Sequence, residues 1–212
     1  MSIRIINDIP EAQRTILARQ PLADEELSPG VRAGIRRIFG EDLSAAQVVD
    51  RILGDVRRDG DTALRAYTEA IEDARITAER DTGTVVRWIY DIPGEAGLES
   101  ADATISYAVD HGPASLVGFG LGGPEIGVPR SQFKVHFDRA SAAGLHSVPH
   151  SGESTGPETI WDAIRELGAE RIGHGIASIR DPRLVDHLAE HRIPLEISPT
   201  SNLATRVVER IE

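Results

Sequence analysis

Two histidines and one glutamate stand out in this 212-residue chain, because their types and spacing suit acid–base and metal chemistry. His150 and Glu153 lie in the segment His-Ser-Gly-Glu, and His174 directly precedes a glycine. An imidazole can ligate a metal ion or move a proton, and a carboxyl group can donate a proton. We therefore take these three side chains as the candidate reactive groups.

Each of these groups follows a stretch of sequence that is typical of a β-strand. In the second part of the chain, apolar and β-branched runs alternate with amphipathic stretches at spacings of roughly 23 to 31 residues, as repeated strand–helix units do. Strands are expected at residues 84–92, 115–121, 145–150, 171–174 and 194–198, and helices near 99–109, 129–143, 156–167 and 181–190. The sequence therefore predicts an α/β fold with a parallel sheet, either an open sheet or a segment of a barrel.

Polar residues gather where the expected strands end. Besides the segments with His150 and His174, the clusters Gly122–Glu125 and Pro199–Asn202 follow strands. In α/β barrels the carboxyl ends of the strands carry the reactive groups, so these clusters should share one rim. A lone histidine is more often structural than reactive, but two histidines and a glutamate on one rim favour a functional site.

The first part of the chain, residues 1 to about 68, is predicted to be mainly helical. Ser44 is a candidate N-cap, and apolar residues at helical spacing follow it as far as Val56, before Gly60 ends the helix. Another helix should begin at Asp61, whereas Ser28-Pro29-Gly30 predicts a turn. This part contains no histidine, and we find no group of reactive side chains in it.

The composition excludes several classes of protein. The chain has no cysteine, which rules out a disulfide framework, a thiol nucleophile and a zinc site with cysteine ligands. Its formal net charge of −11 argues against a nucleic-acid partner, which would need a basic surface. Residues 1–20 hold several charges and no apolar run of signal-peptide length, and no stretch is long enough to span a membrane. We therefore expect a cytoplasmic protein without a membrane partner.

The clusters and their surroundings resemble the bacterial type of adenosine deaminase. The segments that carry the resemblance are, in chain order, EAIEDAR (69–75), RWIYDIPGE (87–95), VGFGLGGPE (117–125), HSGE (150–153), RIGHG (171–175) and PTSN (199–202). They run from about residue 68 to about residue 208. The order and spacing of several motifs make the likeness specific.

This resemblance implies a zinc-dependent (β/α)8 barrel, which replaces the 6-amino group of a purine nucleoside by a hydroxyl. His150 would ligate the zinc ion, whose bound water becomes a nucleophile near neutral pH. Glu153 would protonate the purine ring, and His174 would orient or deprotonate the water. Gly123 would offer its backbone to the purine, and Ser201 would help to bind the substrate. The implied reaction is the hydrolysis of adenosine to inosine and ammonia.

Two parts of the family pattern are missing from this sequence. The family ligates zinc with a His-x-His pair on its first strand and an aspartate after its last strand, and neither is found. His150 is then the only one of these zinc ligands expected here, whereas a catalytic zinc ion takes about three protein ligands. About five strands also leave a barrel incomplete, with sheet edges open to self-association. We therefore expect weak or absent deaminase activity from this chain alone.

The first part of the chain carries a different likeness. Residues Asp55–Glu69 resemble the N-terminal region of histidinol dehydrogenase, whose reactive residues lie outside that region. We therefore divide the chain into a helical segment at 1–68 and a partial deaminase barrel at 69–212. Two alternatives to a deaminase remain: a non-catalytic fusion or truncated fragment that self-associates, and a histidinol dehydrogenase-like assembly module.

Two other motifs have simpler explanations. Gly118–Gly123 fits the glycine pattern of dinucleotide sites, but Pro124 and Pro129 delay the helix that such a site needs. His187 and His191 lie one helical turn apart, as in one zinc-protease motif, but no third ligand accompanies them. We expect solvated histidines on an amphipathic helix there.

Overall fold

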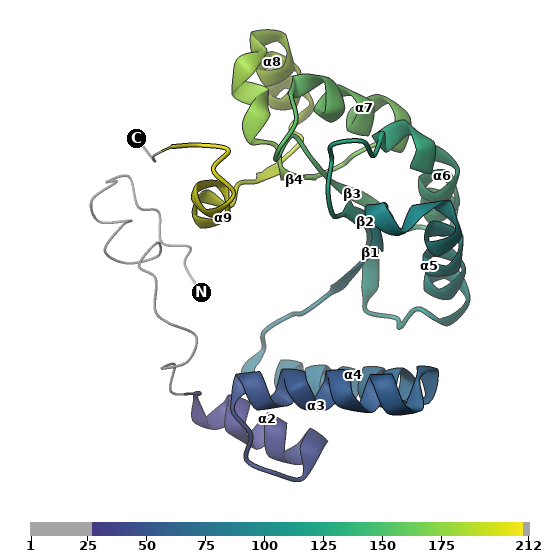
Figure 1. Ribbon diagram of the computed structural model, residues 1–212, viewed down its shortest axis with the longest axis vertical. Helices are drawn as coiled ribbons and strands as arrows, with labels where there is room; N and C mark the ends of the chain where they lie inside the picture. Colours follow the sequence, from purple (N-terminus) through teal and green to yellow (C-terminus); the bar gives the residue numbers. More distant parts are fainter. Residues whose placement is uncertain (1–26, 210–212) are drawn as a thin grey trace. The chain divides into compact units, whose positions relative to one another are not determined.

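The computed structural model describes residues 27–209. The chain forms two compact units, which divide between Val86 and Arg87 (Figure 1). Residues 1–20, in which we expected no targeting signal, lie outside the described part. Within residues 27–209, no helix is long and apolar enough to cross a lipid bilayer.

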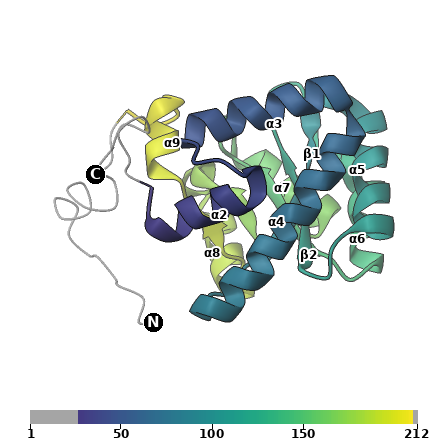
Figure 2. The ribbon, with the colours of Figure 1, turned by 90° about the horizontal axis from the view of Figure 1, so that it is seen from below.

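The N-terminal unit contains helices α2 (Pro29–Phe39), α3 (Ala45–Asp59) and α4 (Asp61–Thr82). Helix α4 packs against both α2 and α3 (Figure 2). The prediction that Ser44 caps α3 is confirmed, because its hydroxyl accepts a hydrogen bond from the Gln47 amide while the Gln47 side chain accepts one from the Ser44 amide. Gly60 follows the last residue of α3, and α4 begins directly after it, as expected.

The predicted turn at residues 28–30 is wrong, because these residues begin helix α2. The Ser28 hydroxyl accepts a hydrogen bond from the Val31 amide at 3.4 Å, and Pro29 is the first helical residue. Proline suits this position because the first amides of a helix have no acceptor within it. A serine and a proline that would interrupt a helix in its interior therefore start one here.

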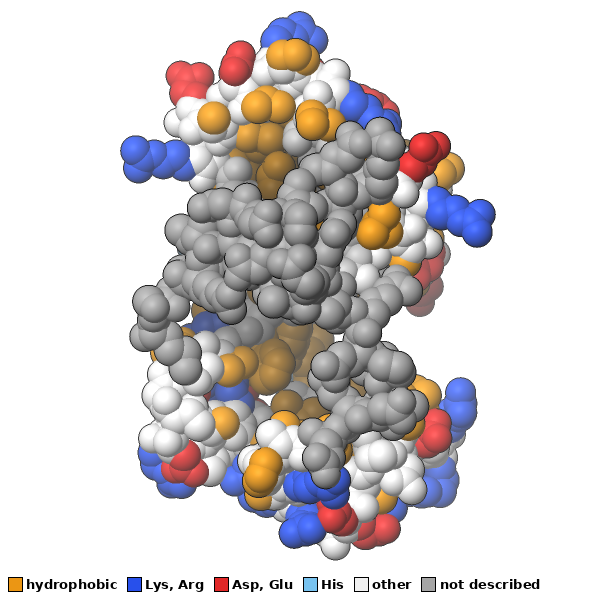
Figure 3. Space-filling model, turned by 90° about the vertical axis from the view of Figure 1, so that its left-hand side faces the viewer, with side chains coloured by type: hydrophobic (Ala, Val, Ile, Leu, Met, Phe, Trp, Pro, Cys, Tyr) orange, Lys and Arg blue, Asp and Glu red, His pale blue; other side chains and the backbone are white. Residues whose placement is uncertain are grey.

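Few side chains of the N-terminal unit are buried. Among its described residues, Asp55 and Ala63 are buried, whereas Val49, Leu53 and Leu64 remain about half exposed. Figure 3 shows hydrophobic side chains of this unit exposed between charged ones. With so few buried side chains, the described part of this unit has little hydrophobic core of its own. Burial of apolar area is the main stabilising contribution in a fold, so this unit gains little from it.

Asp55 is the centre of a polar cluster between α3 and α4. Its carboxylate accepts a hydrogen bond from the Tyr67 hydroxyl and another from Arg51 Nε at 2.9 Å, and Arg58 Nη2 lies 2.9 Å away. The hydrogen bonds from Tyr67 and Arg51 lower the pKa of Asp55 to about 2. The buried carboxylate is therefore held as an anion by donors from both helices.

The C-terminal unit alternates strands and helices. Its elements are β1 (Trp88–Pro93), α5 (Gly97–His111), β2 (Leu116–Gly122), α6 (Lys134–Ala142), β3 (His146–Ser151), α7 (Pro157–Leu167), β4 (Ile172–His174), α8 (Pro182–His191), β5 (Leu195–Glu196) and α9 (Pro199–Ala204), with short 3-10 helices at Gly94–Ala96, Arg130–Phe133 and Ile176–Arg180. The strands pair in parallel in the order β1-β2-β3-β4-β5. The predicted fold class, an incomplete TIM-type barrel that follows a helical segment, is confirmed.

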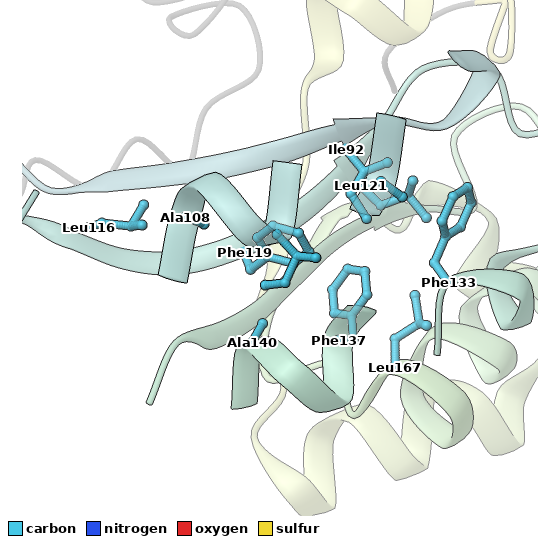
Figure 4. Packing of buried hydrophobic residues seen from close by; sticks show 11 residues of the cluster. Ile92, Ala108, Leu116, Phe119, Leu121, Phe133, Phe137, Ala140 and Leu167 are labelled. Atoms are coloured by element: carbon cyan, nitrogen blue, oxygen red, sulfur yellow. The ribbon is translucent and has the colours of Figure 1, made fainter. Parts of the chain in front are cut away.

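The larger of two hydrophobic core clusters in this unit lies between the sheet and helices α5 and α6 (Figure 1). Phe119 and Leu121 of β2 and Ile92 of β1 are fully buried there, together with Phe133 and Phe137 (Figure 4). The rings of Phe119 and Phe137 meet edge to face, with centroids 5.4 Å apart. Alternate residues of β2 thus fill the helix side of the sheet, while glycines occupy the positions between them.

Three strands are shorter than predicted, and β4 lacks only the first of its four expected residues. Strand β1 begins at Trp88 and not at residue 84. Its pairing starts at this residue, where the Trp88 amide donates a hydrogen bond to the carbonyl of Ser115, the residue before β2. Strand β5 consists of Leu195 and Glu196 alone. The expected division at 68/69 falls inside the continuous helix α4, and the compact units divide at 86/87. The division at 68/69 follows sequence likeness and stays a prediction.

Candidate active site

The register of the central strands brings the predicted reactive groups to one rim. His150 of β3 pairs with Gly173 of β4, and Ser151 pairs with His174. Glu153 lies two residues after the end of β3. All three candidate side chains therefore come from the carboxyl ends of two neighbouring parallel strands, where α/β barrels place their reactive groups.

His174 and Glu153 approach each other. The distance from His174 Nε2 to the nearest Glu153 carboxylate oxygen is 3.5 Å, and the side chains are 11% and 23% exposed. His174 has a φ of 64°, an uncommon backbone conformation for a residue other than glycine and one that often marks a functional position. Its Nδ1 atom is buried and has no hydrogen-bond partner among the described residues. The pair can exchange a proton with a ligand placed against both side chains.

His150 lies beside His174, with ring centroids 5.2 Å apart and the rings nearly perpendicular. Its imidazole covers Gly173, where a Cβ atom would lie 2.4 Å from His150 Cδ2. The side chain is 37% exposed, so it is open to a ligand. The glycine on the neighbouring strand is therefore what allows His150 to lie against the sheet.

Asp91 of β1 is a site residue that the sequence did not lead us to. Its carboxylate lies 3.9 Å from His150 Nε2 and covers Gly120 of β2, where a Cβ atom would lie 1.9 Å from Asp91 Oδ1. Partial burial raises the pKa of the Asp91 carboxyl, Glu196 acts in the same direction, and the charge of His150 opposes both. The signal in the sequence was a single carboxylate in the apolar segment Trp-Ile-Tyr-Asp-Ile-Pro.

Gly123 and Ser201 lie on the same rim but are not joined to the reactive groups. Gly123 has a φ of 81°, and a Cβ atom there would lie 2.0 Å from a carboxylate oxygen of Glu95. Ser201 lies in α9, where its carbonyl accepts a hydrogen bond from the Thr205 amide. Within residues 27–209, no hydrogen bond or ion pair links either residue to Glu153. Their predicted roles in substrate binding stay predictions.

A cavity of about 610 Å³ opens beside Glu153. Its wall contains Ser154, Thr155 and Asn202 as polar residues, and the rest is largely apolar, with Ile176, Ala177, Ile179, Ile197, Pro199, Val207 and Val208, and two arginines, Arg180 and Arg206. The Asn202 side chain is buried, and neither of its polar atoms has a hydrogen-bond partner among the described residues. A mostly apolar cavity with a few unpaired polar groups is typical of a small-molecule site.

The glycine motif Gly118–Gly123 lacks an early helix, as expected, whereas His187, expected to be solvated, is half-buried. After Gly118–Gly123 the next helical residues begin only at Arg130, so no helix opens within the glycine motif. His187 and His191 lie on α8 with their rings stacked 4.0 Å apart, and His187 also contacts Trp161. Within residues 27–209, no third potential ligand joins them in a metal-binding group.

The family model described as "Adenosine deaminase" matches residues 46–212. The match covers most of the chain and contains both strand ends that carry His150, Glu153 and His174. The chain belongs to the adenosine deaminase family. The match also takes in Asp55–Glu69, which we compared with histidinol dehydrogenase, and the comparisons give that second likeness no support.

Curated relatives in the adenosine deaminase family carry two different names. The aminodeoxyfutalosine deaminase of Streptomyces avermitilis is 66% identical over 150 residues, which are 70% of this chain and 42% of the relative. The adenosine deaminase of Edwardsiella ictaluri is 45% identical over 145 residues, which are 68% of this chain and 43% of the relative. The chain thus spans less than half the length of these relatives.

Solved structures of deaminases and related hydrolases share the fold. The adenine deaminase of Arthrobacter aurescens superposes with a TM-score of 0.62 at 30% identity, over 69% of this chain and 47% of that chain. An amidohydrolase from Burkholderia ambifaria with bound zinc gives a TM-score of 0.63 at 25% identity, over 68% and 40%. The second of these proteins contains the metal that the sequence resemblance implies for the family.

The described residues do not form a complete site for such a metal ion. A catalytic zinc ion takes about three protein ligands and a water molecule. Among residues 27–209, no group of three histidine, aspartate or glutamate side chains is placed to hold one ion. His150 is open to a ligand and has Asp91 near it, but two side chains fall short of the set.

Proposed function

We propose that this chain provides the purine-binding and proton-transfer side of a nucleoside deaminase site. The observation that carries the proposal is the contact between Glu153 and His174, 3.5 Å apart at the carboxyl ends of β3 and β4 and beside the cavity. An acid and a base in contact on this rim suit a reaction that adds water and releases ammonia. Membership of the adenosine deaminase family supports the same reaction.

The proposed roles follow the resemblance to the family, and the contact between Glu153 and His174 supports the roles of those two side chains. Glu153, with its carboxyl group protonated, donates a proton to a ring nitrogen of the purine, so that the carbon bearing the amino group accepts water. His174 Nε2 accepts a proton from that water and returns it to the departing amino group, which leaves as ammonia. The hydroxyl group left on the carbon gives its proton back to the Glu153 carboxylate as the carbonyl of the product forms. Gly123 offers its backbone to the purine, and Ser201 contributes to the substrate site. His150 is the residue of this chain that would ligate zinc.

For the substrate, we propose aminodeoxyfutalosine ahead of adenosine. The relative at 66% identity carries the first name and the relative at 45% carries the second. The largely apolar cavity beside Glu153 supports a purine nucleoside as the substrate class. The chain covers 42% of the first relative. Turnover by the isolated chain therefore requires that its own residues be sufficient to bind and deaminate the nucleoside.

The test is release of ammonia from each nucleoside by the purified chain, with zinc supplied. Glu153→Gln should abolish the release, because the amide cannot donate the proton. Glu158→Gln is the matched control, since Glu158 lies in the first turn of α7, five residues after Glu153, and is exposed. Absence of turnover by the unmodified chain with both nucleosides would contradict the proposal.

A second candidate function, a non-catalytic chain that self-associates through the edges of its sheet, is favoured by the incomplete metal site. Strands β1 and β5 end the described sheet, and an unpaired strand edge can add a further strand. Light scattering coupled to size-exclusion chromatography separates the candidates. A monomer with turnover supports the deaminase, and an oligomer without turnover supports self-association.

A further inference from the structure

Glu125 lies in the loop after β2, within the cluster Gly122–Glu125, and the proposed reaction does not use it. Its side chain is 1% exposed. One carboxylate oxygen, Oε2, accepts hydrogen bonds from the backbone amides of Ser154 and Thr155 at 2.6 and 3.1 Å. The same oxygen accepts from their hydroxyls at 3.2 and 3.1 Å. A single buried oxygen thus binds both residues that follow Glu153.

The charge of Glu125 is maintained by its surroundings. Arg130 is completely buried, and its Nη2 atom lies 3.7 Å from Glu125 Oε1. Burial acts to raise the pKa of the Glu125 carboxyl, but the Ser154 amide, the charge of Arg130 and the hydroxyl donors outweigh it, and the pKa lies below its usual value. Hydrogen bonds to an ionised acceptor are about twice as strong as those between neutral groups. The loop after β3 is therefore held by charged hydrogen bonds.

The position of this contact matters for the reactive groups. The residues that Glu125 binds follow Glu153 directly, and Glu153, Ser154 and Thr155 all contribute to the cavity wall. Thr155 is also tied to the start of α7, because its hydroxyl lies 2.7 Å from the Thr159 hydroxyl. A shift of about 1 Å in such a loop can cost roughly a hundredfold in rate, since proton transfer depends on orientation. The main chain after Glu153 is thus fixed from the loop that follows the neighbouring strand β2.

We propose that Glu125 is a positioning residue, which holds the main chain after Glu153 so that the Glu153 carboxyl group meets His174. The inference rests on the proposed function for its effect on turnover. Its structural part is independent of that function, because it concerns a contact within this chain. The two parts are tested by separate measurements on the same variants.

The first measurement is nuclear magnetic resonance of the full chain. In Glu125→Ala, the Ser154 and Thr155 amides should exchange with solvent at least about tenfold faster, because their acceptor is gone. The nuclear Overhauser contact between the Glu153 side chain and the His174 ring should be lost. Glu125→Gln keeps an acceptor oxygen but no charge and should restore part of both signals. It also supplies these readouts if Glu125→Ala does not fold.

The matched control is Glu158→Gln. Glu158 also accepts a backbone hydrogen bond in this loop, from the Gly156 amide at 3.1 Å, but it does not bind Ser154 or Thr155. In this control variant, the exchange rates of the Ser154 and Thr155 amides and the Glu153–His174 contact should equal those of the unmodified chain. A folded Glu125→Ala variant that keeps the Glu153–His174 contact would overturn the inference.

The second measurement is turnover, which separates positioning from general stability. Where the unmodified chain deaminates a nucleoside, Glu125→Gln should lower kcat about tenfold or more while KM changes less than about twofold. A change in melting temperature with unchanged kcat would overturn the positioning role. If the unmodified chain shows no turnover, the proposed function fails, and the resonance measurements still decide this inference.

Discussion

The imidazole of His150 lies against Gly173, and the two residues are paired across strands β3 and β4. A Cβ atom at position 173 would lie 2.4 Å from His150 Cδ2 and 3.0 Å from Nε2. The first distance is shorter than real Cβ contacts, and the second is tighter than most of them. The orientation of the proposed metal ligand therefore depends on the absence of a side chain on the next strand.

Gly173→Ala should displace the His150 ring and destabilise the C-terminal unit by about 1–3 kcal/mol, as overpacking of a filled space does. Urea denaturation measures the loss, and the ring proton shifts of His150 report the displacement. Gly54→Ala is the control, because a Cβ atom there meets nothing within 4 Å. It should stabilise helix α3 by up to about 1 kcal/mol. Equal stability of the 173 variant and the unmodified chain would contradict the steric explanation.

Zinc should bind this chain weakly, since the described residues offer no group of three ligands. His150→Ala should remove the affinity that remains, as measured by competition with a chromophoric chelator. His187→Ala serves as the control, because His187 and His191 are stacked on α8 and can bind zinc adventitiously. If zinc affinity is unchanged in the His150 variant and lost in the His187 variant, His150 is not the ligand.

The pKa of Asp55, lowered to about 2, predicts an acid-sensitive N-terminal unit. A carboxyl group with a depressed folded-state pKa stabilises the fold above its ordinary value of 3.8, and this contribution is lost as the pH falls through about 2. We expect the helices around Asp55 to lose stability between those two values. Titration of the 13C carboxyl signal of Asp55 measures the pKa directly.

Tyr67→Phe is the matching variant for this titration. It removes the first of the hydrogen bonds that lower the pKa and leaves Arg51 and Arg58 in place. The Asp55 signal should then titrate at a higher pH than in the unmodified chain. An Asp55 carboxyl that titrates near 3.8 in the unmodified chain would refute the assigned cluster.

Phe119→Ala should destabilise the C-terminal unit by about 3–5 kcal/mol, because the ring is fully buried and contacts Phe137 edge to face. The midpoint of chemical denaturation measures this change. Val135→Ala, at a position on α6 that is 65% exposed, should stay within about 0.5 kcal/mol. Similar midpoints for the two variants would show that the aromatic cluster is not the core.

The positions of most helices and strands in the C-terminal unit could be predicted from sequence, because each depends on local periodicity. The expected strand at 145–150 became β3, His146–Ser151, and the expected helix at 156–167 became α7, Pro157–Leu167. The rim with His150, Glu153 and His174 followed from strand ends in the same way. At residues 28–30 the sequence predicts a turn where a helix begins, because serine and proline mark both turns and helix starts.

The contacts that shape the site were decided only by tertiary structure. Asp91 meets His150, and Glu125 binds Ser154, across strands that are distant in the sequence. No local pattern encodes such pairs, because each needs a register between strands and a glycine or a loop that leaves room. The sequence by itself determined which residues could react and on which rim they lie. Packing of the sheet decided their neighbours, since side chains from separate strands meet only when the strands pair.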